Sequence, residues 1–116
     1  MPFRFCSCCT IAVWWASVSK TIVQKFGGSS LATAELREIA ASRVLETKVR
    51  GYMPVVVCSA LGRAPDPYAT DTLSALFGPN KGGPNRDLLL ATGEMIACAL
   101  FAEQLCSWGA PAQAMT

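Results

Sequence analysis

Two short apolar segments on either side of a helical pattern decide most of what this chain can fold into. Residues 55–58, VVVC, form a continuous β-branched run, which is typical of a parallel strand covered on both faces. Residues 22–25 predict an earlier strand, and the helical pattern between the two begins at a Thr33 cap and ends at Gly51. Strand, helix and strand predict a right-handed βαβ unit whose strands end at the same edge of the sheet.

The sequence KFGGSS places a lysine, two glycines and two serines directly after the first predicted strand. Glycine lets a ligand approach the backbone closely. The amides of Gly27 and Gly28 and the hydroxyl of Ser29, at the start of a helical segment, favour an anion such as phosphate. Lys25 adds a flexible point charge that can follow a phosphate during transfer. For an isolated GGS, a plain turn between strand and helix is the alternative interpretation.

A polar loop and one apolar helix make up the second half of the chain. Residues 61–84 are rich in Gly, Pro, Asn and Asp, and loops of that length are usually functional or mobile. The segment LLLATGE then leads into a helix that is apolar on all sides and stops at Gly109, which predicts that it is buried. A buried Glu94 needs a cation or a ligand, whereas a capping or surface glutamate does not. Residues 110–116 predict the entry to a third strand.

The composition excludes several classes of site. The chain has no histidine, which excludes histidine acid–base catalysis, serine–histidine triads and mixed Cys/His zinc sites. Its 10 basic and 8 acidic residues are scattered, so we do not expect nucleic-acid binding. Cys58, Cys98 and Cys106 lie in apolar segments and predict core thiols. The cluster at residues 6–9, CSCC, lacks a second pair at usable spacing, and we assign no metal ligand.

Residues 1–19 do not fit the remainder of the chain. They contain an apolar run over residues 5–18 that is too short to span a bilayer comfortably, and no clean signal-peptide cleavage site follows it. A leader of doubtful origin or an extra strand is our interpretation, with secretion and a membrane-surface tether as alternatives. We therefore separate residues 1–19 from a domain over residues 20–116, for which we expect a cytoplasmic location and no membrane.

Four motifs that occur in one order, KFGGSS, SALG, TDTL and LLLATGE, resemble those of aspartate kinases. The resemblance covers about residues 20–116 and corresponds to the N-terminal part of that family's catalytic domain. It implies an α/β fold of three layers, α/β/α, with a mainly parallel sheet, known as the amino-acid kinase fold. The loop DPYATDTL is similar to that of the diaminopimelate-sensitive branch of bacterial aspartate kinases.

This resemblance implies ATP-dependent phosphorylation of L-aspartate to 4-phospho-L-aspartate, the first step toward lysine, threonine and methionine. It implies that Lys25 stabilises the transferring phosphoryl group. It also implies that Ser59 and Thr70 help to hold aspartate and that Glu94 accepts the α-ammonium group of the substrate. The residues implied to bind the phosphates of ATP follow one another in the chain: Lys25, Phe26, Gly27, Gly28 and Ser29.

Most members of that family continue into a nucleotide-binding half and paired ACT domains. We therefore expect this chain to be an incomplete N-terminal portion, inactive alone, with the Mg²⁺ ligands and adenine site elsewhere and a homo-oligomer as the full-length state. The stretch at residues 62–64, GRA, departs from a more polar stretch common in the family. The alternatives are another enzyme of the same fold, such as a glutamate, acetylglutamate or uridylate kinase, and a non-catalytic fragment that binds a full-length kinase.

Overall fold

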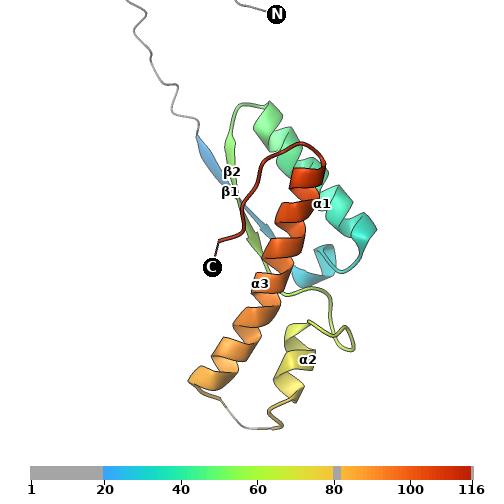
Figure 1. Cartoon of the computed structure of the whole chain (residues 1–116), viewed down its shortest axis with the longest axis vertical. Coiled ribbons are helices and arrows are strands. Elements are labelled where there is room, and N and C mark those ends of the chain that lie inside the picture. Colours follow the sequence, from blue (N-terminus) through green and yellow to red (C-terminus); the bar gives the residue numbers. More distant parts are fainter. Residues whose placement is uncertain (1–19, 80–81, 116) are drawn as a thin grey trace, which may run out of the picture.

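The computed structural model describes residues 20–79 and 82–115, so the hypotheses on residues 1–19 lie outside the described part. Two strands lie beside two long helices, and a short helix lies next to the N-terminal half of the second long helix (Figure 1). The elements in chain order are β1 (Thr21–Phe26), the 3-10 turn η1 (Gly28–Ser30), α1 (Ala34–Val49), β2 (Met53–Cys58), α2 (Thr70–Ala75) and α3 (Pro84–Ser107).

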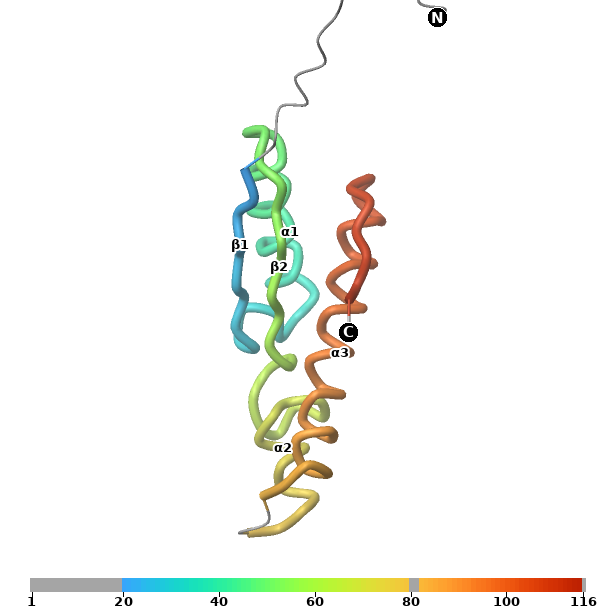
Figure 2. The backbone as a smooth tube through the Cα atoms, turned by 90° about the vertical axis from the view of Figure 1, so that its left-hand side faces the viewer, coloured from blue at the N-terminus to red at the C-terminus, as the bar shows by residue number. Residues whose placement is uncertain are grey.

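Strands β1 and β2 pair in parallel, which confirms the predicted βαβ unit. The register joins Thr21 with Met53 and Phe26 with Cys58, so the two strands end level with each other. Figure 2 shows the strands as one layer, with α3 in a separate layer beside it. Because both carboxyl ends reach the same edge, the loops that follow β1 and β2 begin side by side.

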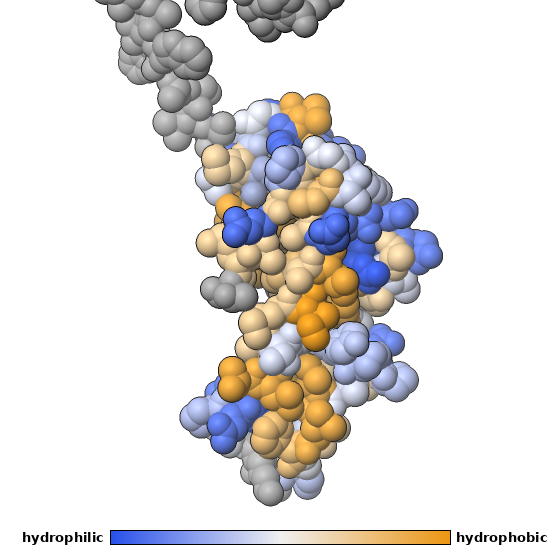
Figure 3. Space-filling view, viewed as in Figure 1, coloured by the Kyte–Doolittle hydropathy of each residue, from blue (hydrophilic) through white to orange (hydrophobic). Residues whose placement is uncertain are grey.

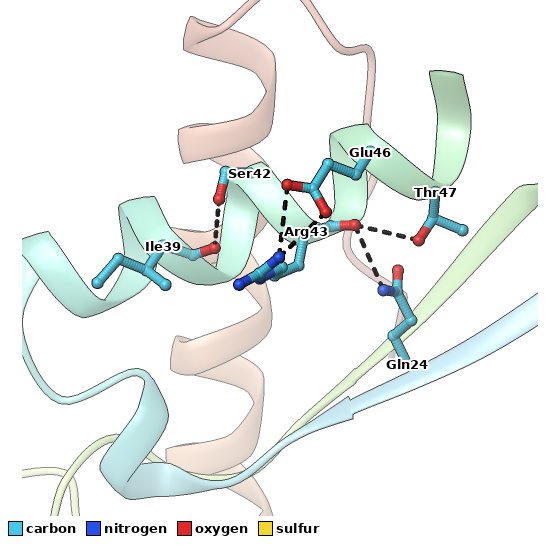
Figure 4. Close-up of polar contacts among 6 residues, drawn as sticks. All are labelled: Gln24, Ile39, Ser42, Arg43, Glu46 and Thr47. Carbon is cyan, nitrogen blue, oxygen red and sulfur yellow. Dashed lines mark hydrogen bonds and ion pairs between the residues drawn. The ribbon is translucent and has the colours of Figure 1, made fainter. Parts of the chain in front are cut away.

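Both long helices cover the same face of this sheet. The ring of Phe26 on β1 packs against Phe101 of α3, with centroids 5.7 Å apart. From the same face, Gln24 Nε2 reaches α1 and donates to the carbonyl oxygen of Arg43 at 3.5 Å (Figure 4). Thr47 Oγ1 donates to that same oxygen at 3.1 Å, so one backbone carbonyl of α1 links the helix surface to the strand.

The opposite face of the sheet is open in the described part of the chain. Val23 is 65% exposed, and Val55 and Val57 are each 46% exposed. The expectation that β2 is covered on both faces is therefore wrong for the described residues, because α1 and α3 pack on one side. Two of the three expected layers, the sheet and one helical layer, lie within residues 20–79 and 82–115.

Helix α1 begins and ends as the sequence predicts. Thr33 Oγ1 accepts a hydrogen bond from the amide of Leu36 at 3.3 Å. Hydrogen bonding to the backbone, and then to Thr33, lowers the pKa of Glu35 in the first turn. At the other end the backbone of Gly51 has φ +85°, a left-handed conformation that releases the chain toward β2.

We expect Thr33→Ala to lower the free energy of unfolding by about 1 kcal/mol, because the Leu36 amide loses its capping acceptor. Urea denaturation followed by far-UV circular dichroism measures the loss. Thr33→Ser is the matched control, since it keeps the hydroxyl. An equal loss in both variants would show that the hydroxyl does not act as a cap.

Helix α3 buries one stripe rather than its whole circumference. The buried residues recur every fourth position, at Gly93, Ala97, Phe101 and Leu105.

By length and composition α3 could cross a membrane, and 22% of its most apolar 18-residue segment is buried. Its buried stripe packs against the sheet, as in a core helix. Figure 3 shows apolar side chains exposed over the N-terminal half of α3 and over α2. The prediction of burial on all sides is therefore wrong for the described residues.

The C-terminal segment and the cysteines depart partly from expectation. Residues 110–115 form no strand, so the predicted third strand is absent from this part of the chain.

The three cysteines differ in burial. Cys58 is buried and Cys98 half-buried, but Cys106 is exposed. Its sulfur donates to the carbonyl of Ala112 at 3.3 Å and accepts from the amide of Ala112 at 3.4 Å. The prediction of a core thiol is wrong for Cys106, which instead fastens the C-terminal segment to the end of α3.

Candidate functional site

The loops that follow β1 and β2 are joined by backbone hydrogen bonds at the carboxyl edge of the sheet. The amide of Ser59 donates to the carbonyl of Phe26 at 3.1 Å, and the amide of Gly62 donates to the carbonyl of Gly28 at 2.9 Å. The motifs KFGGSS and SALG are therefore in direct contact. Open α/β sheets bind their ligands at this edge.

The contact between the two loops requires glycine at position 28. A Cβ atom there would lie 2.3 Å from the carbonyl oxygen of Ala60 and 2.9 Å from that of Gly62. Both distances are shorter than real Cβ contacts, and both neighbours are backbone atoms. Gly27, one position earlier, would meet nothing within 4 Å. The second glycine of KFGGSS is thus fixed by packing between loops.

Helix α3 reaches the same point through Gly93. A Cβ on Gly93 would lie 2.8 Å from the carbonyl oxygen of Tyr68 and 3.1 Å from Cβ of Ala60. Ala60 is 3% exposed and contacts Gly28 on one side and Gly93 on the other. We refer to Gly28, Ala60 and Gly93 as the small-residue junction. It brings together the loop after β1, the loop after β2 and the helix that follows TDTL.

The predicted aspartate-binding residues lie within two positions of this junction or its contacts. Ser59 precedes Ala60 and is half-buried. Glu94 follows Gly93, and Thr70 comes two residues after Tyr68, whose carbonyl contacts the Gly93 position. Glu94 is exposed, which agrees with the surface glutamate that the sequence left open as the alternative to a buried one. A hydrated carboxylate needs no partner within the chain, so burial no longer argues for a ligand at Glu94.

The predicted phosphate-binding residues do not all lie in the same environment. Lys25 is exposed on the open face of the sheet, near its carboxyl edge. Ser29 is exposed in η1, and within the described residues the amides of Gly28 and Ser29 have no hydrogen-bond acceptor. Phe26 differs from these, because its ring packs against α3 and its carbonyl accepts from Ser59. Its side chain therefore belongs to the core.

Ala60 was not among the site residues expected from the sequence. Helix α3 is continuous through Gly93. The small residues in SALG and TGE were the signal available in the sequence. They become informative only once the two segments are known to be in contact.

A cavity of about 480 Å³ lies away from the predicted site residues, between the edge of β2, α3 and the C-terminal segment. None of the predicted site residues lines it.

Comparisons with known proteins agree on one family. Residues 20–116 match the amino acid kinase family. Aspartokinase 1 of Bacillus subtilis (strain 168) is 44% identical over 100 residues, covering 84% of this chain and 25% of that protein. An aspartokinase of Corynebacterium glutamicum is 43% identical over 95 residues, covering 82% of this chain and 22% of that protein.

The structural comparison gives the same relation. The crystal structure of aspartate kinase from Synechocystis matches with a TM-score of 0.66 and 37% identity, over 76% of this chain and 15% of that one. The chain thus spans about a quarter or less of the length of the relatives that it matches.

Proposed function

Because the chain belongs to the amino acid kinase family, we propose that it carries part of the active site of an aspartate kinase. The reaction transfers the γ-phosphoryl group of ATP to the side-chain carboxylate of L-aspartate and gives 4-phospho-L-aspartate, on the route to lysine, threonine and methionine. One observation carries this proposal: segments that are separate in the sequence meet at the small-residue junction, at the edge of the sheet where ligands bind.

In this proposal the loop after β1 binds the phosphates. Phosphoryl transfer depends mainly on positioning and on cations and amides directed at the developing charge. The amides of Gly28 and Ser29 have no acceptor within the described residues, so they are available to phosphate oxygens. Lys25 is exposed at the end of β1, and its ammonium follows the γ-phosphoryl group as charge builds up on it.

The aspartate lies on the other side of the junction. The exposed carboxylate of Glu94 accepts the α-ammonium of the substrate as an ion pair. Hydroxyl groups of Ser59 and Thr70 donate to the substrate and fix its position. Ala60 sets the spacing between these groups and the phosphate loop, because it touches the glycine of each segment.

ATP acts as its magnesium complex in this proposal, and the full-length protein works as a homo-oligomer in the cytoplasm. Within residues 20–79 and 82–115, no group of three His, Cys, Asp or Glu side chains could hold a metal ion. We assign no magnesium ligand among these residues and no step to the ion.

Reconstitution with the rest of a related enzyme tests the proposal. The chain is mixed with a separately expressed segment of Bacillus subtilis aspartokinase 1 that starts where the match ends, and aspartyl phosphate is trapped with hydroxylamine as the hydroxamate. We expect ATP-dependent hydroxamate formation that neither part gives alone. Lys25→Ala is expected to lower the rate by about 100-fold, because an aligned positive charge is lost. Lys20→Ala is the matched control, since Lys20 precedes β1.

Two results would contradict the proposal. ATP-dependent phosphorylation of glutamate, acetylglutamate or uridylate in place of aspartate, followed as release of ADP, would identify another enzyme of the same fold. Inhibition of an intact aspartokinase by the chain, without any reconstituted activity, would support a non-catalytic partner.

A further inference from the structure

Two thiols that the proposed reaction does not use lie together behind the candidate site. Cys58 is the last residue of β2, is 8% exposed and belongs to the buried core cluster, against which Cys98 of α3 packs. Both cysteines are free, and both line the cavity of about 480 Å³ between β2, α3 and the C-terminal segment. The cavity is mainly apolar, with Phe101 and Leu105 among its walls.

We propose that Cys58 and Cys98 form a dithiol site for a soft, thiophilic acceptor, and that a trivalent arsenical is the class of ligand that fits it. Two thiols condense with one arsenoxide group. Both S–H bonds break, two As–S bonds form, and the arsenic-bound oxygen leaves as water with the two protons. No atom changes oxidation state, so the reaction needs no oxidant.

The environment of Cys58 disfavours oxidation of its thiol. Burial, and then the neighbouring Cys98, raises the pKa of Cys58 to about 12. At pH 7 Cys58 is therefore almost entirely the neutral thiol, and peroxides react with the thiolate. Condensation with an arsenoxide consumes both thiols together with their protons, which leave on the arsenic-bound oxygen as water. Soft sulfur ligands also select soft acceptors.

The cavity has room for the organic group of the ligand. A buried apolar cavity of roughly 150 Å³ holds benzene, whereas the space beside these thiols is about 480 Å³. A phenyl group therefore fits along the apolar wall while arsenic bridges the two sulfurs. Cys106 cannot replace Cys58 in the bridge, because it lies eight residues beyond Cys98, roughly 12 Å along the axis of α3.

A bridge at this place would fix the end of β2 to α3. Cys58 immediately precedes Ser59, and Cys98 lies one helical turn beyond Glu94. The dithiol site thus connects the strand that precedes Ser59 with the helix that carries Glu94. The site itself rests on two free thiols that line one cavity, so it does not depend on the proposed function.

Phenylarsine oxide tests the site directly. The probe is added to the full chain with Cys6, Cys8 and Cys9 replaced by serine, and the product is measured by intact and peptide mass spectrometry. Trypsin cuts after Arg63 and Arg86, so Cys58 and Cys98 fall on different peptides. We expect one phenylarsenic group per chain, with these two peptides joined through it. A small dithiol should remove the group, and a monothiol should not.

Matched variants separate the bridge from other binding. Cys106→Ser should keep the adduct, and Cys98→Ser should lose it while retaining the far-UV circular dichroism spectrum. If Cys98→Ser fails to fold, Cys98→Ala serves in its place. Hydrogen peroxide at neutral pH should leave Cys58 open to alkylation after unfolding. Retention of the adduct in the Cys98 variants, its loss in Cys106→Ser, or peptides that stay separate would overturn the proposal.

Discussion

Replacing Phe101 with alanine is expected to lower the free energy of unfolding by about 3–5 kcal/mol, the largest loss that we predict for any single side chain of this protein. Phe101 is 2% exposed and sits at the centre of the stripe that α3 buries. Its ring packs against Phe26 of β1 with centroids 5.7 Å apart. Truncation removes this contact and enlarges the cavity that Phe101 already lines. Because small domains are stable by about 5–15 kcal/mol, the change removes a large part of the total stability.

The neighbouring residue on the same helix supplies the control for Phe101. Leu100 is 45% exposed, so Leu100→Ala removes a large apolar side chain from α3 with little change in the core. We expect it to cost less than about 1 kcal/mol. Thermal and urea unfolding followed at 222 nm measure both variants. Equal losses would mean that α3 does not pack against the sheet through Phe101.

Local signals in the sequence predicted most of the secondary structure. The strand at residues 22–25 and the helix capped by Thr33 are formed as expected, because each depends on a few neighbouring residues. The parallel pairing also followed, since a short strand, a helix and a second strand leave few other topologies. The resemblance to aspartate kinases is confirmed by the relatives and by the solved structure.

Burial could not be predicted in the same way. An apolar composition shows that α3 can be buried. Which of its residues are buried, such as Ala97 and Phe101, depends on the elements that pack against the helix. The apolar neighbours of Glu94 left a buried and a surface position both open, and Glu94 lies outside that stripe and is exposed. The contact of Ala60 with both Gly28 and Gly93 joins segments more than 30 residues apart in sequence, which no local pattern reports. The roles of the site residues in catalysis stay predictions.

Gly28→Ala is expected to have the second largest effect, because the change inserts one methyl group where two backbone oxygens already lie. The new Cβ would be 2.3 Å from the carbonyl oxygen of Ala60 and 2.9 Å from that of Gly62. Backbone atoms cannot rotate away as a side chain does, so the loops after β1 and β2 have to separate. This separation breaks the hydrogen bond from the Gly62 amide to the Gly28 carbonyl, which is 2.9 Å long. We expect a loss of about 2–3 kcal/mol in unfolding free energy.

A variant at the adjacent glycine, Gly27, is the control. It shows how much of the effect comes from replacing any glycine and how much from the steric clash at position 28. Gly27 has φ −75° and ψ 163°, an extended conformation that alanine adopts freely, and a Cβ there meets nothing within 4 Å. Gly27→Ala should therefore change the urea midpoint little. In the reconstituted enzyme Gly28→Ala should also lower the rate of hydroxamate formation, because the amides of Gly28 and Ser29 move away from the phosphates. If the two variants behave alike, close contact between the loops is not what position 28 requires, and the small-residue junction does not hold the site together.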